Sequence, residues 1–250
     1  MKKAKFIWTD QNTRSRMRHA CMRRRFNIGE IPRQAEFACF ANSYYHLWIN
    51  GHHVGFGPAR SYPEFPEYDR YLLTPYLRAG ENELTVLVRH VGFPTFHSQT
   101  MGAFFIGWGR VGEFNLATGE GWEVAECNAY DSETPWFSFA QPPTDWYDAA
   151  KDPMINPTLP WHPAVSVEAP ENLGTFRPRS IPPLTWEKQP SRDLLWCEKV
   201  NDGWQFEGVR LRAPQDVPQH KRQQASATCL VYSFVHSPRE QEVAVVGHWG

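Results

Sequence analysis

The chain has 250 residues, with 26 Lys and Arg against 27 Asp and Glu and a formal net charge of -1. This length allows one large domain, or one complete domain and part of another, while the balanced charge provides no overall field that would attract phosphate backbones or anionic lipid. No apolar run is long enough to span a bilayer. We therefore expect neither nucleic acid nor a membrane as a partner.

The N-terminal segment carries a local excess of arginine. Its apolar stretch, Phe6 to Trp8, is too short for the apolar region of a secretory signal, so we expect a cytoplasmic location. The arginines could form a phosphate-binding arm, but the rest of the chain is not basic, and we interpret them as a solvated edge strand with a flexible loop. They are Arg14, Arg16, Arg18, Arg23, Arg24 and Arg25.

Short apolar runs bounded by Gly, Pro, Asn and Asp recur along the chain, and none follows the i, i+3, i+4, i+7 repeat of a long helix. This pattern predicts an all-β fold. The predicted strands of the first part are residues 5–8, 23–28, 35–49, 52–56, 83–91, 103–110, 113–116 and 122–128.

Two turn signals lie within this pattern, on either side of an aromatic and proline-rich crossing. Asn50-Gly51 predicts a type I′ hairpin, because both residues tolerate the positive φ angles that this turn requires. Thr74-Pro75 predicts a single helical turn, with the Thr74 hydroxyl as its cap and Gly80 closing it. Tyr76-Leu77 should pack this turn onto the sheets.

Proline interrupts the chain repeatedly from Pro135 to Pro190, and each proline removes a backbone donor and restricts the residue before it. We therefore predict a connection without ladder pairing. Because flexible linkers are poor in aromatic residues, the aromatics here indicate that the segment wraps around the first domain, and a boundary is expected near Thr185. These aromatics are Trp136, Phe137, Phe139, Trp146, Tyr147 and Trp161.

Short apolar runs typical of strands recur at residues 203–212, 227–236 and 242–246. Glu242 to Gly247 aligns with Glu36 to Ala41, which is a weak internal repeat. We predict a first domain at residues 1–185 and the start of a second, truncated β-sandwich domain at residues 186–250. On this interpretation the sequence is the front part of a longer protein, whose downstream domains are its partners.

Several motifs follow one another in a specific order. They are Phe6-Ile7-Trp8-Thr9, Asn50-Gly51, Gly57-Pro58-Ala59-Arg60-Ser61, Tyr68-Asp69 with Tyr71, Thr74-Pro75-Tyr76-Leu77-Arg78, Gly80-Glu81-Asn82 and Arg179-Ser180-Ile181-Pro182-Pro183-Leu184. This series resembles the N-terminal domain of bacterial α-L-rhamnosidases and related glycoside hydrolases, over residues 5–185. The resemblance implies a jelly-roll, galactose-binding-like β-sandwich, placed ahead of further β-domains and an (α/α)₆ barrel that carries the catalytic acid and base.

Aromatic residues give the main functional signal, since 11 Trp, 9 Tyr and 16 Phe exceed what one sandwich core must bury. Their rings suit sugar CH faces and protein interfaces alike. Three roles stay open: core packing, contact with further domains, and contact with glycan, for which a rhamnose-containing glycan is the expected ligand. The candidate carbohydrate-binding residues are Arg60, Tyr62, Glu64, Phe65, Tyr68 and Trp108.

Acidic and histidine side chains could support other chemistry. Glycoside hydrolysis needs two carboxyl groups facing one bond, but we interpret Glu64, Glu67 and Asp69 as structural or surface groups and predict no catalytic residue. The histidines lack metal-ligand spacing and are predicted to be exposed at turns and strand ends. They are His52, His53, His90 and His97.

The cysteines are odd in number and widely spaced, without a C-x-x-C pair, so we predict neither a disulfide framework nor a metal site. They are Cys21, Cys39, Cys127, Cys197 and Cys229. No glycine-rich phosphate loop or dinucleotide motif occurs, so no cofactor is expected, although scattered oxygen ligands for calcium would leave no motif.

Taken together, these features lead to one functional hypothesis with two alternatives. The chain is hypothesised to be a non-catalytic accessory region of an α-L-rhamnosidase-like glycoside hydrolase, which supports the catalytic barrel and contacts glycan. The alternatives are an independent carbohydrate-binding module and a purely structural scaffold between domains.

Overall fold

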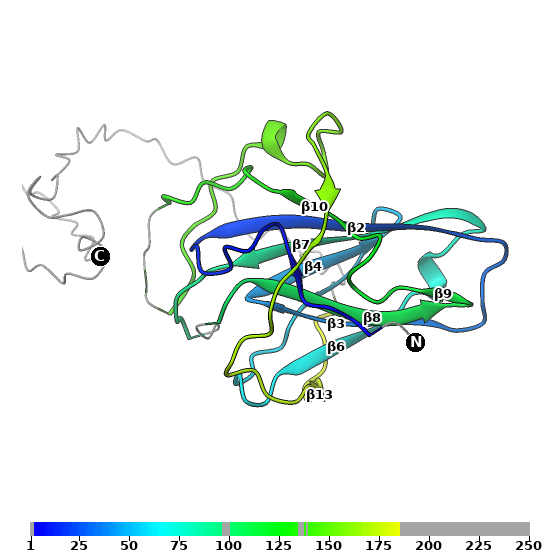
Figure 1. Cartoon of the computed structure of the whole chain (residues 1–250), viewed down its shortest axis with the longest axis horizontal. Helices are drawn as coiled ribbons and strands as arrows, with labels where there is room; N and C mark the ends of the chain where they lie inside the picture. The colour runs from blue at the N-terminus through cyan, green and yellow to red at the C-terminus, as the bar shows by residue number, and fades with distance from the viewer. Residues whose placement is uncertain (1–2, 97–100, 135–137, 139, 186–250) are drawn as a thin grey trace, which may run out of the picture. The chain divides into compact units, whose positions relative to one another are not determined.

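The computed structural model of the protein describes residues 3–96, 101–134, 138 and 140–185. Its strands form two layers that pack face to face (Figure 1). In chain order, the elements are β1 (Ile7–Trp8), β2 (Arg18–Ile28), β3 (Ala35–Asn42), β4 (Tyr44–Ile49), β5 (His52–Gly57), β6 (Glu67–Leu72), η1 (Thr74–Tyr76), β7 (Gly80–His90), β8 (Phe104–Val111), β9 (Phe114–Asn115), β10 (Glu123–Glu126), η2 (Ala149–Lys151), β11 (His162–Pro163), β12 (Val165–Ser166) and β13 (Arg177–Pro178).

The two layers are a seven-stranded and a six-stranded sheet. The first has the order β12-β1-β8-β3-β6-β13, with β9 paired to β8, and the second has the order β11-β10-β2-β7-β4-β5. The strands pair antiparallel, except that β13 pairs parallel with β6. The predicted all-β sandwich is confirmed. None of the helices among the described residues is long and apolar enough to cross a membrane.

Large buried rings from both sheets fill the space between the layers. Phe37 on β3, Phe105 on β8 and Tyr45 on β4 are completely shielded from solvent. The rings of Tyr45 and Phe105, which come from opposite sheets, have centroids 6.3 Å apart. Trp122 closes the same cluster, with its ring 5.7 Å from that of Phe105. Part of the aromatic surplus is therefore ordinary core.

The predicted Asn50-Gly51 hairpin is confirmed by the backbone. Asn50 has φ 49° and Gly51 has φ 81°, the positive values that a type I′ turn requires, and β4 pairs with β5 across the turn. The Asn50 side chain adds a second function: its Oδ1 atom accepts a hydrogen bond from the Glu83 amide at 3.0 Å, and its Nδ2 atom donates to the Tyr76 carbonyl at 2.9 Å. The turn is thus attached to β7 through Glu83 and to η1 through Tyr76.

The helical turn at Thr74-Pro75 forms as η1, but the predicted capping role of the Thr74 hydroxyl is wrong. Thr74 is the first residue of η1 and makes no side-chain cap. Its hydroxyl instead accepts a hydrogen bond from the Ala35 amide at 2.9 Å, which attaches the turn to the start of β3. Leu77 is buried against the core, as predicted.

The prediction of an edge strand for the N-terminal arginines is wrong. Strand β2 lies in the middle of its sheet, between β10 and β7. Its arginines are held by partners on those neighbours: Arg23 pairs with Glu123 at 2.8 Å, and Arg18 pairs with Glu126 at 2.9 Å. Cross-strand ion pairs let a central strand carry charge on its outer face, so an excess of arginine does not identify an edge.

The predicted single strand at residues 35–49 is two strands in different sheets. The chain leaves the seven-stranded sheet after Asn42 and enters the six-stranded sheet at Tyr44. Buried hydrogen bonds fix this change of sheet. The side-chain amide of Asn42 donates to the carbonyl of Met101 at 2.9 Å, and the backbone amide of Ser43 donates to the carbonyl of Arg89 at 2.9 Å. Apolar periodicity cannot show this switch, because both segments are buried.

Two further predictions about strands need correction. Residues 67–72, assigned to the proline-rich crossing, form strand β6. The proline-rich connection that begins at Pro135 was predicted to have no ladder pairing, but it forms the two-residue strands β11, β12 and β13, each at the end of a sheet. Pro163 and Pro178 lie in these strands, where a missing donor is tolerated because one side of an edge strand has no partner.

Several predictions concern residues that the structure does not describe. The division into domains at residue 185 and the second domain therefore remain predictions. The residues and strands in question are His97, Trp136, Phe137, Phe139, Cys197, Cys229 and residues 203–212, 227–236 and 242–246.

Candidate functional site

The six candidate carbohydrate-binding residues do not form one site. Tyr68 and Trp108 line a pocket of about 860 Å³ on the seven-stranded sheet, which we call the aromatic groove. Arg60, Tyr62 and Phe65 line a separate pocket of about 330 Å³. The sixth residue, Glu64, is exposed and lines neither pocket.

The smaller pocket lies in the loop between β5 and β6. Tyr62 and Phe65 are 67% and 51% exposed, and the Arg177 guanidinium lies over the Phe65 ring at 4.3 Å from its centroid. This contact already covers one face of Phe65 with a cation. A sugar ring would have to stack on the remaining exposed surface.

The aromatic groove is built by three rings from separate parts of the chain. Tyr68 on β6 and Trp108 on β8 have ring centroids 5.0 Å apart, and Phe176, just before β13, lies 5.8 Å from Trp108. Strand β3 runs between β6 and β8, and its residue opposite Trp108 is Ala38. Because alanine presents only a methyl group, the two rings can meet above β3.

Polar side chains surround these rings. The groove combines an apolar floor, which suits the CH face of a sugar, with donors and acceptors that suit its hydroxyl groups. Such a surface also suits packing against another protein domain. The polar residues of the lining are Lys3, Gln34, Glu36, Arg110 and Asn115.

The acidic residues next to the groove have structural partners. Asp69 is buried between the sheets, where it accepts hydrogen bonds from the Tyr45 hydroxyl and from Nη1 of Arg179, the latter at 2.7 Å. Glu67 accepts a bond from the Ser180 hydroxyl at 2.8 Å. The expected structural role of Asp69 is confirmed, and its partners are the side chains of Tyr45 on β4 and Arg179 just after β13.

Burial raises the pKa of Asp69, and the bonds from Tyr45 and Arg179 oppose this rise. The same network explains a glycine in the Gly57-Pro58-Ala59-Arg60-Ser61 motif, because a Cβ atom on Gly57 would collide with the Asp69 carboxylate. Gly57 therefore serves the packing of the core. The bond to Asp69 also gives Arg179, the first residue of the Arg179 to Leu184 motif, a structural role.

Of the histidines predicted to be exposed, His52 agrees with the prediction, whereas His53 and His90 do not. His52 is exposed, and His53 is half-buried beside His46, with the two ring nitrogens 3.0 Å apart. His90 was predicted to be exposed at a strand end, but it is fully buried, with its ring 6.2 Å from that of Trp8. His90 points into the core because it lies on the same face of β7 as Val86 and Val88, which belong to the core cluster.

Potential metal ligands gather on the other sheet. Cys21, Cys127 and Asp152 are all buried, and one ligand atom from each lies within 4.8 Å of the others. This group leaves no local motif in the sequence, because its residues are far apart in the chain. Phe176 in the aromatic groove could not be predicted either, since nothing in the local sequence distinguishes that ring from its neighbours in the wrapping segment.

Comparisons with known proteins extend this description. No family model and no curated protein matches the chain. Among solved structures, the chain is similar to the GH78 family rhamnosidase of Bacillus sp. GL1, with a TM-score of 0.65 and 28% identity over 72% of this chain and 20% of that chain. It is also similar to the α-L-rhamnosidase from Aspergillus terreus, with a TM-score of 0.54 and 18% identity over 71% of this chain and 23% of that one.

The predicted resemblance to rhamnosidases is confirmed by these matches. The chain spans about a fifth of the length of the enzymes that it resembles, as expected for a single region of such an enzyme.

Proposed function

We propose that this chain is the non-catalytic N-terminal accessory region of an α-L-rhamnosidase-like glycoside hydrolase, which supports the catalytic domain and contacts glycan through the aromatic groove. The observation that carries the proposal is the similarity to the Bacillus enzyme, at 28% identity over 72% of this chain but only 20% of the enzyme. A region of this size and fold is one component of such an enzyme.

The non-catalytic role of this chain is supported by the structural hydrogen bonds of its acidic residues. Glycoside hydrolysis requires two carboxyl groups about 5 to 10 Å apart that face one bond. Asp69 is instead committed to Tyr45 and Arg179, and Glu67 to Ser180. On this proposal, the catalytic acid and base lie in the parent protein, beyond the described residues.

An assay on aryl rhamnosides tests this division. The 250-residue chain and the longer parent protein are compared at equal concentration, and we expect turnover from the parent alone. Turnover by the isolated chain would place the catalytic groups within it and refute the proposal.

A second candidate function is an independent carbohydrate-binding module, and the aromatic groove is the observation that favours it. Trp108 is half-buried in the wall of the groove and contacts the rings of Tyr68 and Phe176, so its ring can stack on a sugar while these contacts fix its position. Titration calorimetry with rhamnose and rhamnose-containing polysaccharides measures this binding directly.

The matched variants are Trp108→Ala in the groove and Trp146→Ala in the wrapping segment, where Trp146 is 55% exposed. Loss of a stacking ring costs about 1 kcal/mol, so we expect binding to weaken about 5- to 10-fold in Trp108→Ala, with no change in Trp146→Ala. Absence of heat at millimolar ligand would exclude glycan contact and leave the supporting role.

If the groove serves only to join domains, its rings should be covered in the parent protein. The isolated chain would then self-associate through the groove, and Trp108→Ala would reduce this association without any change in sugar binding. Light scattering of the two proteins separates this scaffold function from a module that binds glycan.

A further inference from the structure

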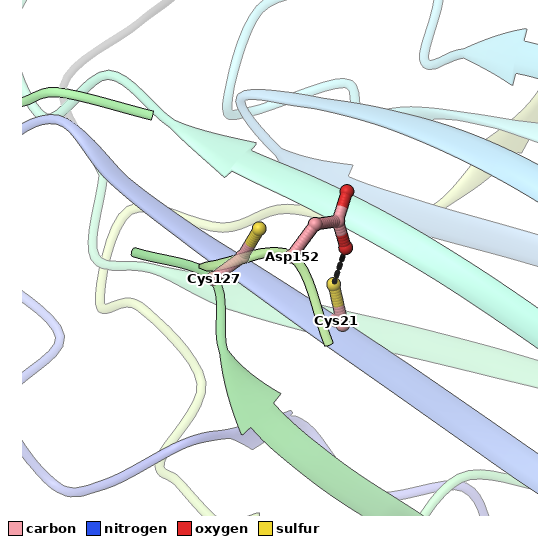
Figure 2. Close-up of side chains that lie close together, drawn as sticks. All are labelled: Cys21, Cys127 and Asp152. Carbon is pink, nitrogen blue, oxygen red and sulfur yellow. Dashed lines mark hydrogen bonds between the residues drawn. The ribbon is translucent and has the colours of Figure 1, made fainter. Parts of the chain in front are cut away.

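Three buried side chains converge on the outer face of the six-stranded sheet, away from the aromatic groove. Figure 2 shows Cys21 on β2, Cys127 just after β10, and Asp152 just after η2 with their functional groups directed toward one another. The Sγ atom of Cys21 lies 4.0 Å from Oδ1 of Asp152, and the three ligand atoms lie within 4.8 Å of one another.

The pairing of β2 with β10 sets the distance between the two thiols. Cys21 lies opposite Ala125, while the Cys127 amide donates to the His19 carbonyl at 2.9 Å. The cysteines are therefore diagonal neighbours on one face, and the Cβ atoms of such a pair are about 7 Å apart or slightly closer. A disulfide needs Cβ atoms about 3.5 to 4.5 Å apart, so this geometry favours a bridging atom over a direct bond.

The third ligand is oriented by its own hydrogen bonds. Oδ1 of Asp152 accepts from the Met154 amide at 2.8 Å, and Oδ2 accepts from the Tyr147 hydroxyl at 2.7 Å. Asp152 is 6% exposed, and no lysine or arginine among the described residues pairs with it. A buried carboxylate beside two thiols is a costly arrangement unless a positive charge compensates it.

The surroundings close the cluster from solvent. The apolar residues packed around the two cysteines are Leu87, Ala129, Trp48, Tyr130, Met154 and Trp161. His19, on the same face two residues before Cys21, has a buried Nδ1 atom without a hydrogen-bond partner among the described residues. The His19 ring stacks on that of Tyr130, with centroids 4.1 Å apart, and its nitrogens are not among the three ligand atoms that converge.

We propose that Cys21, Cys127 and Asp152 bind a thiophilic divalent cation of the Zn²⁺ type. Two sulfur ligands and one carboxylate suit zinc, whereas calcium and magnesium prefer oxygen ligands alone. Zinc–sulfur bonds of about 2.3 Å span the gap between the thiols, whose protons are released to solvent on binding. The ion attaches the segment that follows β10 to strand β2.

Cobalt provides the direct test, because thiolate coordination gives Co²⁺ an intense near-ultraviolet charge-transfer band. The full chain is used with Cys197→Ser and Cys229→Ser, under reducing and anaerobic conditions, and Co²⁺ is titrated and then displaced by Zn²⁺. We expect one equivalent of Co²⁺, loss of the band in Cys21→Ser and in Cys127→Ser, and slower proteolysis of residues 129–161 when Zn²⁺ is bound.

Two further variants separate ligation from general damage to the fold. Tyr147→Phe removes a hydrogen bond to the ligating carboxylate, and we expect about 10- to 100-fold weaker Zn²⁺ binding. Cys39→Ala removes a buried thiol on β3, outside the cluster, and should leave the band unchanged. Circular dichroism of every variant identifies those that fail to fold.

Three results would overturn the proposal. The first is a full chain that gives no cobalt band although it is folded and reduced. The second is a band that persists at full intensity in the folded Cys21→Ser and Cys127→Ser variants. The third is a reduced protein that binds no Zn²⁺ but forms a Cys21–Cys127 disulfide in air, as found by non-reducing peptide mapping.

Discussion

The buried pair of Asp69 and Arg179 gives the most quantitative prediction for the stability of the β-sandwich. Arg179→Met removes the guanidinium, whose side chain is 13% exposed, and leaves the carboxylate of Asp69, which is 2% exposed, with the Tyr45 hydroxyl as its remaining side-chain donor. Removing one member of a buried pair costs about 3 to 5 kcal/mol, mostly because the other charge stays buried. We expect a loss of this size at pH 7.

The cost should depend on pH, and the sign follows from the pKa of Asp69. Burial already raises this pKa, and Arg179 opposes the rise, so the variant raises it further. The native state then holds a proton more tightly than the unfolded chain, in which aspartate has a pKa of about 3.9. Stability therefore falls as the pH rises from the unfolded pKa to the folded pKa, by up to about 1.4 kcal/mol per pH unit.

Urea unfolding of the wild type and Arg179→Met at pH 5 and pH 7, followed by near-ultraviolet circular dichroism, measures both effects. Asp69→Asn/Arg179→Met should recover part of the loss, because it removes the charge that is left unpaired. The matched control is Arg25→Met, which breaks a pair with Glu83 in which the two side chains are 61% and 40% exposed; it should cost less than about 1 kcal/mol. A similarly small cost in Arg179→Met, or an equal cost at both pH values, would refute the reasoning.

Three further predictions concern the free energy of unfolding, measured by the same urea titration at pH 7. Gly51→Ala should cost about 1 to 2 kcal/mol, because φ is 81° and the surrounding space is open; Gly29→Ala, which also has open space but no positive φ, should cost less than about 0.5 kcal/mol. Gly57→Ala should cost about 1 to 3 kcal/mol through collision with the buried carboxylate. Phe105→Ala should cost about 3 to 5 kcal/mol, and Tyr62→Ala, at a ring that is 67% exposed, less than about 0.5 kcal/mol. The first argument is contradicted if Gly51→Ala and Gly29→Ala have equal effects. The second is contradicted if Gly57→Ala has no measurable effect, and the third if Phe105→Ala and Tyr62→Ala have equal effects.

Local signals in the sequence were enough for the parts of the fold that depend on local geometry. Asn50-Gly51 predicts its hairpin because the turn has one strong requirement, positive φ at two adjacent residues, which both residues meet. The change of sheet at Ser43 could not be predicted in this way. Its cause is a set of hydrogen bonds to Met101 and Arg89, which are distant in sequence, and the apolar pattern continues across it without a break.

The candidate sites show the same limit. Tyr62, Phe65 and Tyr68 are close in sequence, but β6 begins at Glu67 and places Tyr68 on the sheet while the other two stay in the loop. The sequence pattern therefore predicted one binding surface where the structure has two. The cysteine cluster was missed for the opposite reason, because Cys21 and Asp152 are 131 residues apart and meet through the folding of the wrapping segment.

This wrapping segment belongs to the domain in an energetic sense, because it supplies partners for both sheets. Asp152 reaches the outer face of the six-stranded sheet, and Arg179 enters between the sheets to pair with Asp69. Ser180 follows with two bonds to Glu67, donated by its hydroxyl to Oε1 at 2.8 Å and by its backbone amide to Oε2 at 3.0 Å. A protein that ended before Arg179 would leave the Asp69 charge buried without its guanidinium, at the cost estimated for Arg179→Met. The proline-rich stretch is therefore part of the folded β-sandwich at least as far as Ser180, and the side chains that attach it are polar ones, which apolar periodicity does not detect.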